Sequence, residues 1–304
     1  MKPRNIVFIV AYAIALTGIS LWMGQLSYSW FPPQASAESL LIDKLFAFLV
    51  TLGTFIFLGI TGVMIYSVVF QRATKYDFSD GPHIEGNVTL EVVWTAIPIL
   101  LVFWLAGYSY YIYDQMAIRG PMEMMHLSMG HGDTTTAVEE QPTEEIEVIS
   151  KQWAWVFRYP KSNVTSTELH LPANHRIKLA LTSEDVLHGL YIPAFRVKQD
   201  IVPNETIDFE FTPIKEGTYR LRDSQFSGTY FATMQTNVVV ESPEDYQTWL
   251  AEAKKRKPSP AYNQAAAEYS EHTQRTFKTG WPTVIPADPP VVNYSKNESP
   301  LSPL

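Results

Sequence analysis

The 304-residue sequence contains no cysteine, and its 23 basic residues are outnumbered by 31 acidic ones. Without cysteine the chain forms no disulfide, so any part of it outside the cytoplasm must be stable without covalent cross-links. The same absence excludes every metal centre that is held by thiolate ligands. The net charge of −8 argues against a nucleic-acid partner, because binding to phosphates requires an excess of Lys and Arg.

Apolar residues make up 46% of the chain, and many are concentrated in three long runs near the N-terminus. The runs span about residues 6–23, 45–70 and 92–113, and each is long enough to cross a bilayer as a helix. The first run resembles the start of a secretory signal, and the small residues 35–37 (Ala-Ser-Ala) are of the kind found at cleavage sites. Because these residues lie well beyond the run, we expect an uncleaved signal-anchor helix, with cleavage as the alternative.

The basic residues that flank these runs define an orientation. They precede the first run and follow the second, whereas the connector 25–40 contains no Lys or Arg. The flanking residues are Lys2, Arg4, Arg72 and Lys75. By the positive-inside rule, the N-terminus and the loop 71–90 are predicted to be cytoplasmic, so that everything after the third run lies in the periplasm or a lumen. We therefore expect an integral protein of a bacterial plasma or thylakoid membrane.

Beyond the third run, apolar and polar residues alternate in short stretches, which is typical of half-buried strands. The stretches are residues 146–149, 176–181, 206–211, 217–221 and 236–240. Their spacing predicts a β-sandwich or Greek-key barrel, with antiparallel strands. Ser242 and Pro243 are expected to begin a helix that ends near Lys254, and a short helix is expected at Gln264–Thr273.

These patterns predict a membrane-anchored α+β protein. Residues 1–40 are expected to form the signal-anchor helix and its connector, and residues 41–116 a transmembrane helical hairpin. A linker at 117–145 leads to a β domain at 146–256 and a proline-rich tail at 257–304. Because the tail has no apolar periodicity, we expect it to be extended over a partner or partly disordered.

Four segments resemble those of cytochrome c oxidase subunit II and occur in that family's order. The loop 222–234 is similar to the loop that binds the family's dinuclear copper centre, CuA. The others are Leu-Glu-Val-Val-Trp at 90–94, Gln-Trp-Ala-Trp at 152–155 and His-Gly-Leu-Tyr-Ile-Pro at 188–193. The resemblance covers about residues 40–250. It implies two family membrane helices, here preceded by the anchor helix, and a cupredoxin-like sandwich or barrel outside the membrane.

The family's copper loop has the pattern Cys-x-Glu-x-Cys-x-x-x-His-x-x-Met, with a further His upstream. The corresponding residues here are His188, Asp223, Gln225, Ser227, Phe231 and Met234. CuA needs two bridging thiolates, which this chain cannot supply, and Phe231 replaces the second imidazole by an apolar group. We therefore expect a filled loop without metal, with a mononuclear site as the alternative. The family's Mg²⁺ contact is also not expected, because Gln225 carries no charge.

Glu91 matches the family's carboxylate at the mouth of a proton channel that leads into subunit I. A carboxylate near the end of a membrane helix is costly unless it is hydrated, paired or functional. We therefore predict that Glu91 takes up cytoplasmic protons, the alternative being a surface carboxylate favoured by the helix dipole. Trp153 matches the family's electron-accepting tryptophan. Without CuA it has no acceptor, so a packing role is expected.

A segment of the predicted linker is rich in Met and His. Thioether and imidazole groups are good Cu(I) ligands, so the segment is a candidate for weak copper binding. Its residues are Met122, Met124, Met125, His126, Met129 and His131. The alternative is a linker near the bilayer, in which Met serves as packing material.

The resemblance implies subunit II of a haem-copper respiratory terminal oxidase, most like the alternative respiratory terminal oxidase of cyanobacteria. Such an enzyme oxidises a membrane quinol (plastoquinol or ubiquinol), reduces oxygen to water and translocates protons. This chain is expected to hold no redox centre. The haems, CuB and the quinol are expected in subunit I, and subunit III is a further expected partner. One alternative is a soluble donor such as cytochrome c; another is a non-enzymatic, membrane-anchored copper-binding or assembly protein.

Overall fold

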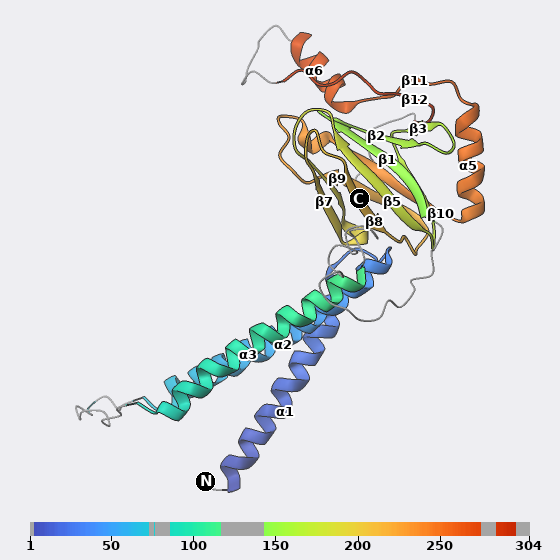
Figure 1. Cartoon of the computed structure of the whole chain (residues 1–304). Coiled ribbons are helices and arrows are strands. Elements are labelled where there is room, and N and C mark those ends of the chain that lie inside the picture. The colour runs from blue at the N-terminus through green and yellow to red at the C-terminus, as the bar shows by residue number, and fades with distance from the viewer. Residues whose placement is uncertain (1–2, 73–75, 77–85, 117–142, 275–283, 296–304) are drawn as a thin grey trace. The chain divides into compact units, whose positions relative to one another are not determined.

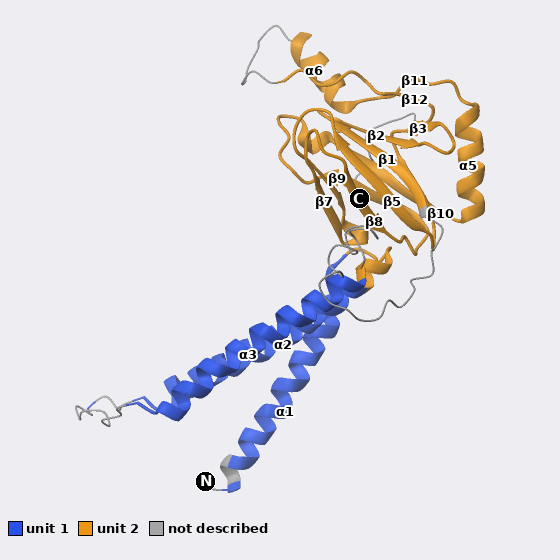
Figure 2. Ribbon diagram, viewed as in Figure 1, with its two compact units in different colours: residues 1–31, 41–115 blue, residues 32–40, 116–304 orange. Residues whose placement is uncertain are grey.

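The computed structural model contains two compact units, which are coloured separately in Figure 2. It describes residues 3–72, 76, 86–116, 143–274 and 284–295. Unit 1 consists of residues 1–31 and 41–115, and unit 2, called the β domain below, of residues 32–40 and 116–304.

Unit 1 is built from three long apolar helices (Figure 1). They are α1 (Pro3–Leu26), α2 (Ala37–Phe70) and α3 (Val88–Met116), and the 3-10 helix η1 (Ser27–Trp30) follows α1. All three are long and apolar enough to cross a membrane, which confirms the prediction of three N-terminal apolar helices. Many of their large apolar side chains are exposed in the isolated chain, as expected for surfaces that contact lipid or other subunits.

Specific contacts hold the helices of unit 1 together. Tyr12 on α1 donates a hydrogen bond from its hydroxyl to the Leu58 carbonyl of α2 at 2.8 Å. The neighbouring Gly62 makes room for this contact, since a side chain there would collide with the Tyr12 hydroxyl. Phe48 on α2 makes an edge-to-face contact with Trp104 on α3, with ring centroids 5.1 Å apart.

The β domain is a sandwich of two five-stranded sheets with strand orders β3-β2-β1-β5-β8 and β4-β10-β9-β6-β7. Its strands are β1 (Thr143–Lys151), β2 (Ala154–Tyr159), β3 (Val164–Ser166), β4 (Leu169–Pro172), β5 (Arg176–Ser183), β6 (His188–Ile192), β7 (Val197–Ile201), β8 (Ile207–Phe211), β9 (Gly217–Asp223) and β10 (Gln235–Glu241). This architecture confirms the predicted cupredoxin-like fold class. The expected antiparallel pairing is only partly correct, because β1 pairs with β5, and β4 with β10, in parallel.

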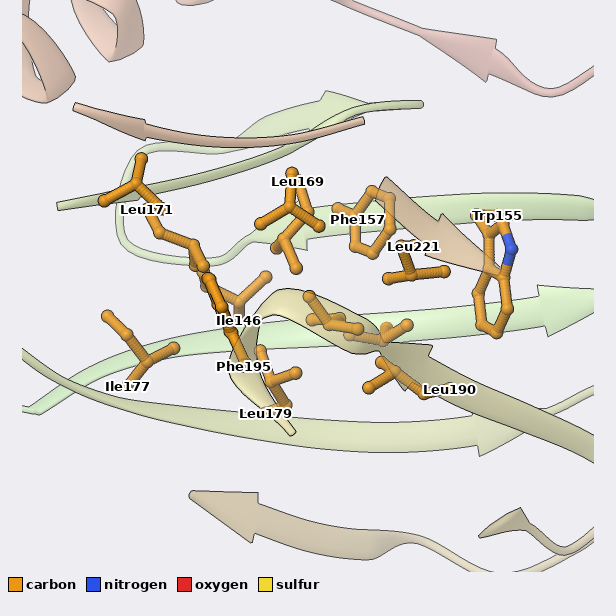
Figure 3. Packing of buried hydrophobic residues seen from close by; sticks show 14 of the residues in the cluster. Ile146, Trp155, Phe157, Leu169, Leu171, Ile177, Leu179, Leu190, Phe195 and Leu221 are labelled. Carbon is orange, nitrogen blue, oxygen red and sulfur yellow. The ribbon is translucent and has the colours of Figure 1, made fainter. Parts of the chain in front are cut away.

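The core lies between the two sheets (Figure 3). In β5 the buried residues Ile177, Leu179 and Leu181 alternate with partly exposed ones, as expected for a strand with one buried face. Leu190 of β6 and Leu221 of β9 are buried from the opposite sheet. Full burial of one such side chain contributes about 1.5–3 kcal/mol, so this layer is the main stabilising element.

The connector between η1 and α2 is part of the β domain. Ala35 is fully buried; its N–H donates to the Ala194 carbonyl at 3.1 Å, and its own carbonyl accepts from the Ile214 N–H at 2.9 Å. Glu38, in the first turn of α2, is also buried and pairs with Arg176 at 3.1 Å. The expected boundary at residue 40 lies inside α2, and residues 32–40 before it belong to the β domain.

Beyond the sandwich lie α5 (Pro243–Lys255), β11 (Ser259–Pro260), α6 (Gln264–Gln274) and β12 (Val291–Val292). Helices α5 and α6 are found where the sequence predicted helices. The Ser242 hydroxyl accepts the Asp245 N–H at 3.1 Å and caps the start of α5. The described part of the tail returns to its own β domain, since β11 pairs with β12 and Tyr294 forms a bridge with Ser166. The expectation of an extended or disordered tail is therefore wrong for these residues.

Candidate functional site

The loop that resembles the family's copper loop connects β9 to β10, and His188 lies beside it at the start of β6. Strands β6 and β9 are paired, with Leu190 opposite Asp223. A hydrogen bond of 3.0 Å from the Asp223 N–H to the Met234 carbonyl closes the base of the loop. The two chain segments that the motif combined are therefore neighbours in the fold.

His188 is fully buried between two carboxylates. Its Nδ1 lies 2.8 Å from Asp223 Oδ2, and its Nε2 lies 2.9 Å from Asp185 Oδ1. Because carboxylate oxygens only accept hydrogen bonds, a doubly protonated imidazole satisfies both contacts. Burial alone would lower the pKa of His188, but the hydrogen bonds and charges of Asp223 and Asp185 outweigh it and raise the pKa above its usual value.

Asp223 is the centre of the hydrogen-bond network in the loop. Its Oδ2 also accepts the Ser227 hydroxyl at 2.8 Å, and its Oδ1 accepts the N–H groups of Gly189 at 2.8 Å and Gln225 at 3.0 Å. The residues at the two thiolate positions, Asp223 and Ser227, are therefore bonded directly to each other. Since the Asp223 side chain is fully buried, these contacts compensate for its lost hydration.

The other three motif positions have separate environments. The Gln225 side chain turns to Asp200, to which its Nε2 donates at 2.8 Å. The Phe231 ring packs against Phe226, with centroids 5.1 Å apart. Met234 is buried, and its carbonyl accepts the Trp155 indole N–H at 3.2 Å. The structure thus joins His188, Asp223 and Ser227 through their side chains.

These residues do not fit the dinuclear copper centre. A carboxylate and a hydroxyl stand in place of the two bridging thiolates, and carboxylates engage both nitrogens of His188. Phe231, at the second imidazole position, has no donor atom. Within the described residues, no three His, Cys, Asp or Glu side chains are placed to hold a metal ion. The arrangement is instead a hydrogen-bonded tie between the loop and the turn that precedes β6.

Trp153 lies against the same loop and is only 3% exposed. Its ring makes an edge-to-face contact with Tyr230 at 5.2 Å. Gly228 has a φ of +120°, and a Cβ there would lie 2.7 Å from the Trp153 ring. Gln152 donates from Nε2 to the Ser227 carbonyl at 2.6 Å. Trp153 is therefore part of the packing of the β domain.

Glu91 lies in the first turn of α3 and is exposed in the isolated chain. The Asn87 side chain accepts the Leu90 N–H at 3.2 Å and caps this end of the helix. One turn further on, the Thr95 hydroxyl donates to the Glu91 carbonyl at 2.8 Å. Glu91 thus lies on the surface of an apolar helix, near its N-terminal end.

Two other parts of the sequence interpretation had different outcomes. The Met- and His-rich segment 122–131 lies outside the described residues, so copper binding there stays a prediction. Asp185, which completes the His188 network, was missed by sequence reasoning. A carboxylate three residues before a histidine of ligand type is the local signal that could have identified it.

Comparisons with known proteins identify the family. The family model for the cytochrome c oxidase subunit II transmembrane domain matches residues 20–112. The model for the periplasmic domain of the same subunit matches residues 163–242. Cytochrome c oxidase subunit 2 of Synechocystis is 33% identical over 278 residues, which cover 83% of this chain and 83% of that protein. The chain belongs to the cytochrome c oxidase subunit II family.

Two further similarities were found. Quinol oxidase subunit 2 of Bacillus subtilis is 26% identical over 215 residues, covering 69% of this chain and 62% of that protein. The periplasmic domain of subunit II of cytochrome oxidase from Bradyrhizobium japonicum is 26% identical and covers 39% of this chain and 97% of that chain, with a TM-score of 0.37. As a family member, the chain is a membrane-anchored subunit II of a haem-copper oxidase with an extracytoplasmic β domain.

Proposed function

We propose that this chain is the non-redox subunit II of an oxidase that oxidises a membrane quinol, plastoquinol or ubiquinol, and that it contains no CuA. One observation carries the proposal. Asp223 and Ser227, at the thiolate positions, are bonded to each other, and both ring nitrogens of His188 are engaged by carboxylates. Such a loop is held by its own side chains and offers no ligand set for a copper pair. The chain then stabilises subunit I, which holds the haems and CuB.

Quinol fits this arrangement better than a soluble donor does. It is apolar and reaches subunit I within the membrane, so it needs no redox centre in the β domain. A cytochrome c that docked on the β domain would have to transfer electrons to subunit I over a longer distance without CuA. The similarity to a quinol oxidase subunit 2 supports the same class of donor.

Oxygen uptake by the purified complex tests this proposal. The complex is expected to consume oxygen with quinol and not with reduced cytochrome c. Metal analysis is expected to find about one copper per complex, that of CuB, because the loop lacks soft ligands. Uptake with cytochrome c alone, or a near-infrared CuA band, would contradict the proposal.

Within this function, Glu91 is proposed to admit protons from the cytoplasmic side. An exposed carboxylate on an apolar membrane helix is favourable only if it meets water, a partner or a functional path. Glu91→Gln should slow quinol oxidation severalfold because the amide cannot exchange a proton, and Glu91→Asp should restore part of the rate. Asp114→Asn, at the other end of α3, is the matched control and should leave the rate unchanged. A wild-type rate in Glu91→Gln would remove this role.

We also propose that α1 is retained as a third membrane helix with a cytoplasmic N-terminus. Cleavage at 35–37 would cut a segment whose main chain is bonded to the β domain, and it would remove Tyr12 from its contact with Leu58. Mass spectrometry of the mature subunit should therefore find peptides that include residues 6–30. A mature chain that begins at residue 36 or 38 would disprove retention.

A further inference from the structure

The tail of the chain is anchored to the β domain at two places. We call residues 259–274 and 284–294 the strap. Its ends are tied together, because β11 pairs with β12 and the Ala261 N–H donates to the Pro290 carbonyl at 2.8 Å. Ala261 and Val292 are buried, so the strap is a packed element rather than a loose extension.

The first anchor is Tyr294. Its ring makes edge-to-face contacts with His170 at 5.2 Å and Trp249 at 5.5 Å, and the Arg256 guanidinium lies 4.9 Å above it. Its N–H donates to the Thr165 carbonyl at 3.0 Å. The side chain of the preceding Asn293 is also bonded to Thr165, accepting from its N–H at 3.1 Å and from its hydroxyl at 3.0 Å.

The second anchor lies on residues 152 and 153. The Ala287 N–H donates to the Gln152 carbonyl at 2.5 Å, and Asn263 donates from Nδ2 to the Trp153 carbonyl at 3.3 Å. Asn263 is fixed in this position, because its Oδ1 also accepts the Ala266 N–H and caps α6. The strap thus satisfies two main-chain carbonyls that would otherwise face solvent or a partner.

The strap also forms one wall of a groove on the β domain. This groove has a volume of about 820 Å³, and its lining includes Trp153, Arg220 and Arg222 as well as Tyr262 of the strap. The indole N–H of Trp153 is buried but has no hydrogen-bond acceptor within the described residues. Buried donors are usually paired, so the packing of the described residues leaves this group unsatisfied.

We propose that the strap occupies a protein-docking surface around Trp153 and keeps soluble electron carriers off it. Without the strap, this surface would combine a Trp with two unpaired main-chain carbonyls and nearby guanidinium groups, and Trp and Arg are enriched where proteins bind one another. Here the occupant is the chain itself, and as an intramolecular occupant it has a high effective concentration. The inference rests on the proposed function in one respect: an oxidase fed by quinol has no need of an open surface at this position.

Because the chain has no cysteine, a single introduced thiol can report on the strap in the intact complex. Ala265→Cys places the thiol at a position that is 1% exposed, and Glu268→Cys places one on the exposed side of the same helix. With a maleimide reagent, the first thiol should react much more slowly than the second. Equal rates would show that the strap is not docked and would overturn the proposal.

Releasing the strap tests the anchor. Adding Tyr294→Ala to Ala265→Cys should raise the labelling rate by about tenfold, which corresponds to ~1.4 kcal/mol of lost anchoring. Tyr262→Ala, which removes a ring of the strap that is 64% exposed, is the control and should leave the rate unchanged. If Tyr294→Ala lowers the yield of the complex, Asn293→Ala serves as the second release variant. An unchanged rate in a folded release variant overturns the proposal.

The docking surface itself is tested with reduced cytochrome c as the probe, by co-sedimentation with the complex in liposomes at low salt. The parent complex should not bind it, whereas the release variant should. Binding by the parent, or no gain of binding after release, overturns the inference. Quinol oxidation is measured on the same samples and should be unaffected by release. If the parent fails to oxidise quinol, the proposed function is lost while the labelling result still stands.

Discussion

The β domain contains two buried histidines, each placed between two carboxylates, and they are held in different ways. His188 is bonded directly to two Asp side chains, at 2.8 and 2.9 Å. His170 faces the longer Glu241 at 3.2 Å and Glu168 at 3.9 Å, and its ring is stacked on Trp249 with centroids 3.9 Å apart. The first histidine ties together two loops by hydrogen bonds. The second joins a strand, a helix and the strap mainly by aromatic packing.

The difference shows that a buried histidine between two carboxylates can be held either by hydrogen bonds or by aromatic packing. Around His188 the acceptors are short Asp side chains, and main-chain N–H groups complete the network. A small change in the length of one of these side chains should therefore break hydrogen bonds and lower the stability of the fold. Around His170 the rings of Trp249 and Tyr294 carry much of the contact, and the carboxylates supply charge. We therefore expect the His188 network to be more sensitive to the loss of one acceptor than the His170 cluster is to the loss of its imidazole.

The largest loss of folding stability is expected from Asp223→Ala. This change leaves the buried His188 without one of its two counter-charges and leaves the N–H groups of Gly189 and Gln225 without their acceptor. Loss of one partner from a buried pair costs ~3–5 kcal/mol. Denaturant unfolding of the full chain in detergent, followed by tryptophan fluorescence, measures the loss. Asp208→Ala breaks the exposed 2.9 Å ion pair with Lys178 and is the control, expected to cost ~0–1 kcal/mol.

A smaller loss of folding stability is expected from His170→Ala. The change removes the ring that stacks on Trp249 and contacts Tyr294, but Asn237 still donates to Glu168 at 2.6 Å. We expect a loss of about 2 kcal/mol in the same unfolding assay. A loss larger than that of Asp223→Ala would reverse the order that we infer from the two clusters.

The pH dependence of stability separates packing from charge at His170. Burial alone would lower the pKa of His170, but the carboxylates of Glu168 and Glu241 outweigh it and raise the pKa. A raised folded-state pKa contributes stability below the usual histidine value of about 6.5, and this stability is lost as the pH rises through the raised value. Unfolding curves from about pH 6 to about pH 9 should therefore show a steeper decline for the wild type than for His170→Asn.

His175→Gln is the matched control for that experiment. Its ring contacts the Ala173 carbonyl at 2.8 Å and lies outside the carboxylate pairs. The variant should keep the wild-type pH profile. Identical profiles for the wild type and His170→Asn would show that the carboxylates do not hold a proton on His170.

The smallest loss of stability is expected when either of two serines in the loop 222–234 is replaced by alanine. Ser227 donates to Asp223 at 2.8 Å, whereas the Ser224 hydroxyl is buried without a hydrogen-bond partner within the described residues. Ser227→Ala should cost ~1 kcal/mol, and Ser224→Ala should be neutral or slightly stabilising. Thermal shift of the two variants side by side measures the difference. An equal loss in both would remove the Ser227–Asp223 bond from the network.

The sequence predicted those features that are carried by local patterns. Run length identified the three membrane helices, and alternation identified five strands, because both follow from the contacts of consecutive residues. The resemblance to the family's copper loop identified His188, Asp223 and Ser227 as neighbours. It did not reveal Asp185 as the second partner of His188, nor the parallel pairing of β1 with β5, since these depend on contacts between distant segments.

The packing of the tail and the grouping of residues around His170 could not be predicted from the sequence for a related reason. The tail lacks apolar periodicity, yet single residues such as Tyr294 and Val292 are buried against the β domain. Contacts made by isolated residues leave no period in the sequence. Glu168 lies two residues before His170, but Glu241 lies at the end of β10, and only the fold brings it to the imidazole.

The network around Asp223 has a consequence for the biogenesis of the protein. A loop whose ties are a carboxylate, an imidazole and a hydroxyl is complete as soon as the chain has folded. It needs no chaperone to deliver an ion and no reductant to keep thiols free beforehand. On the proposed function, we therefore expect this subunit to mature at its normal rate under copper starvation, so that only CuB of subunit I requires copper.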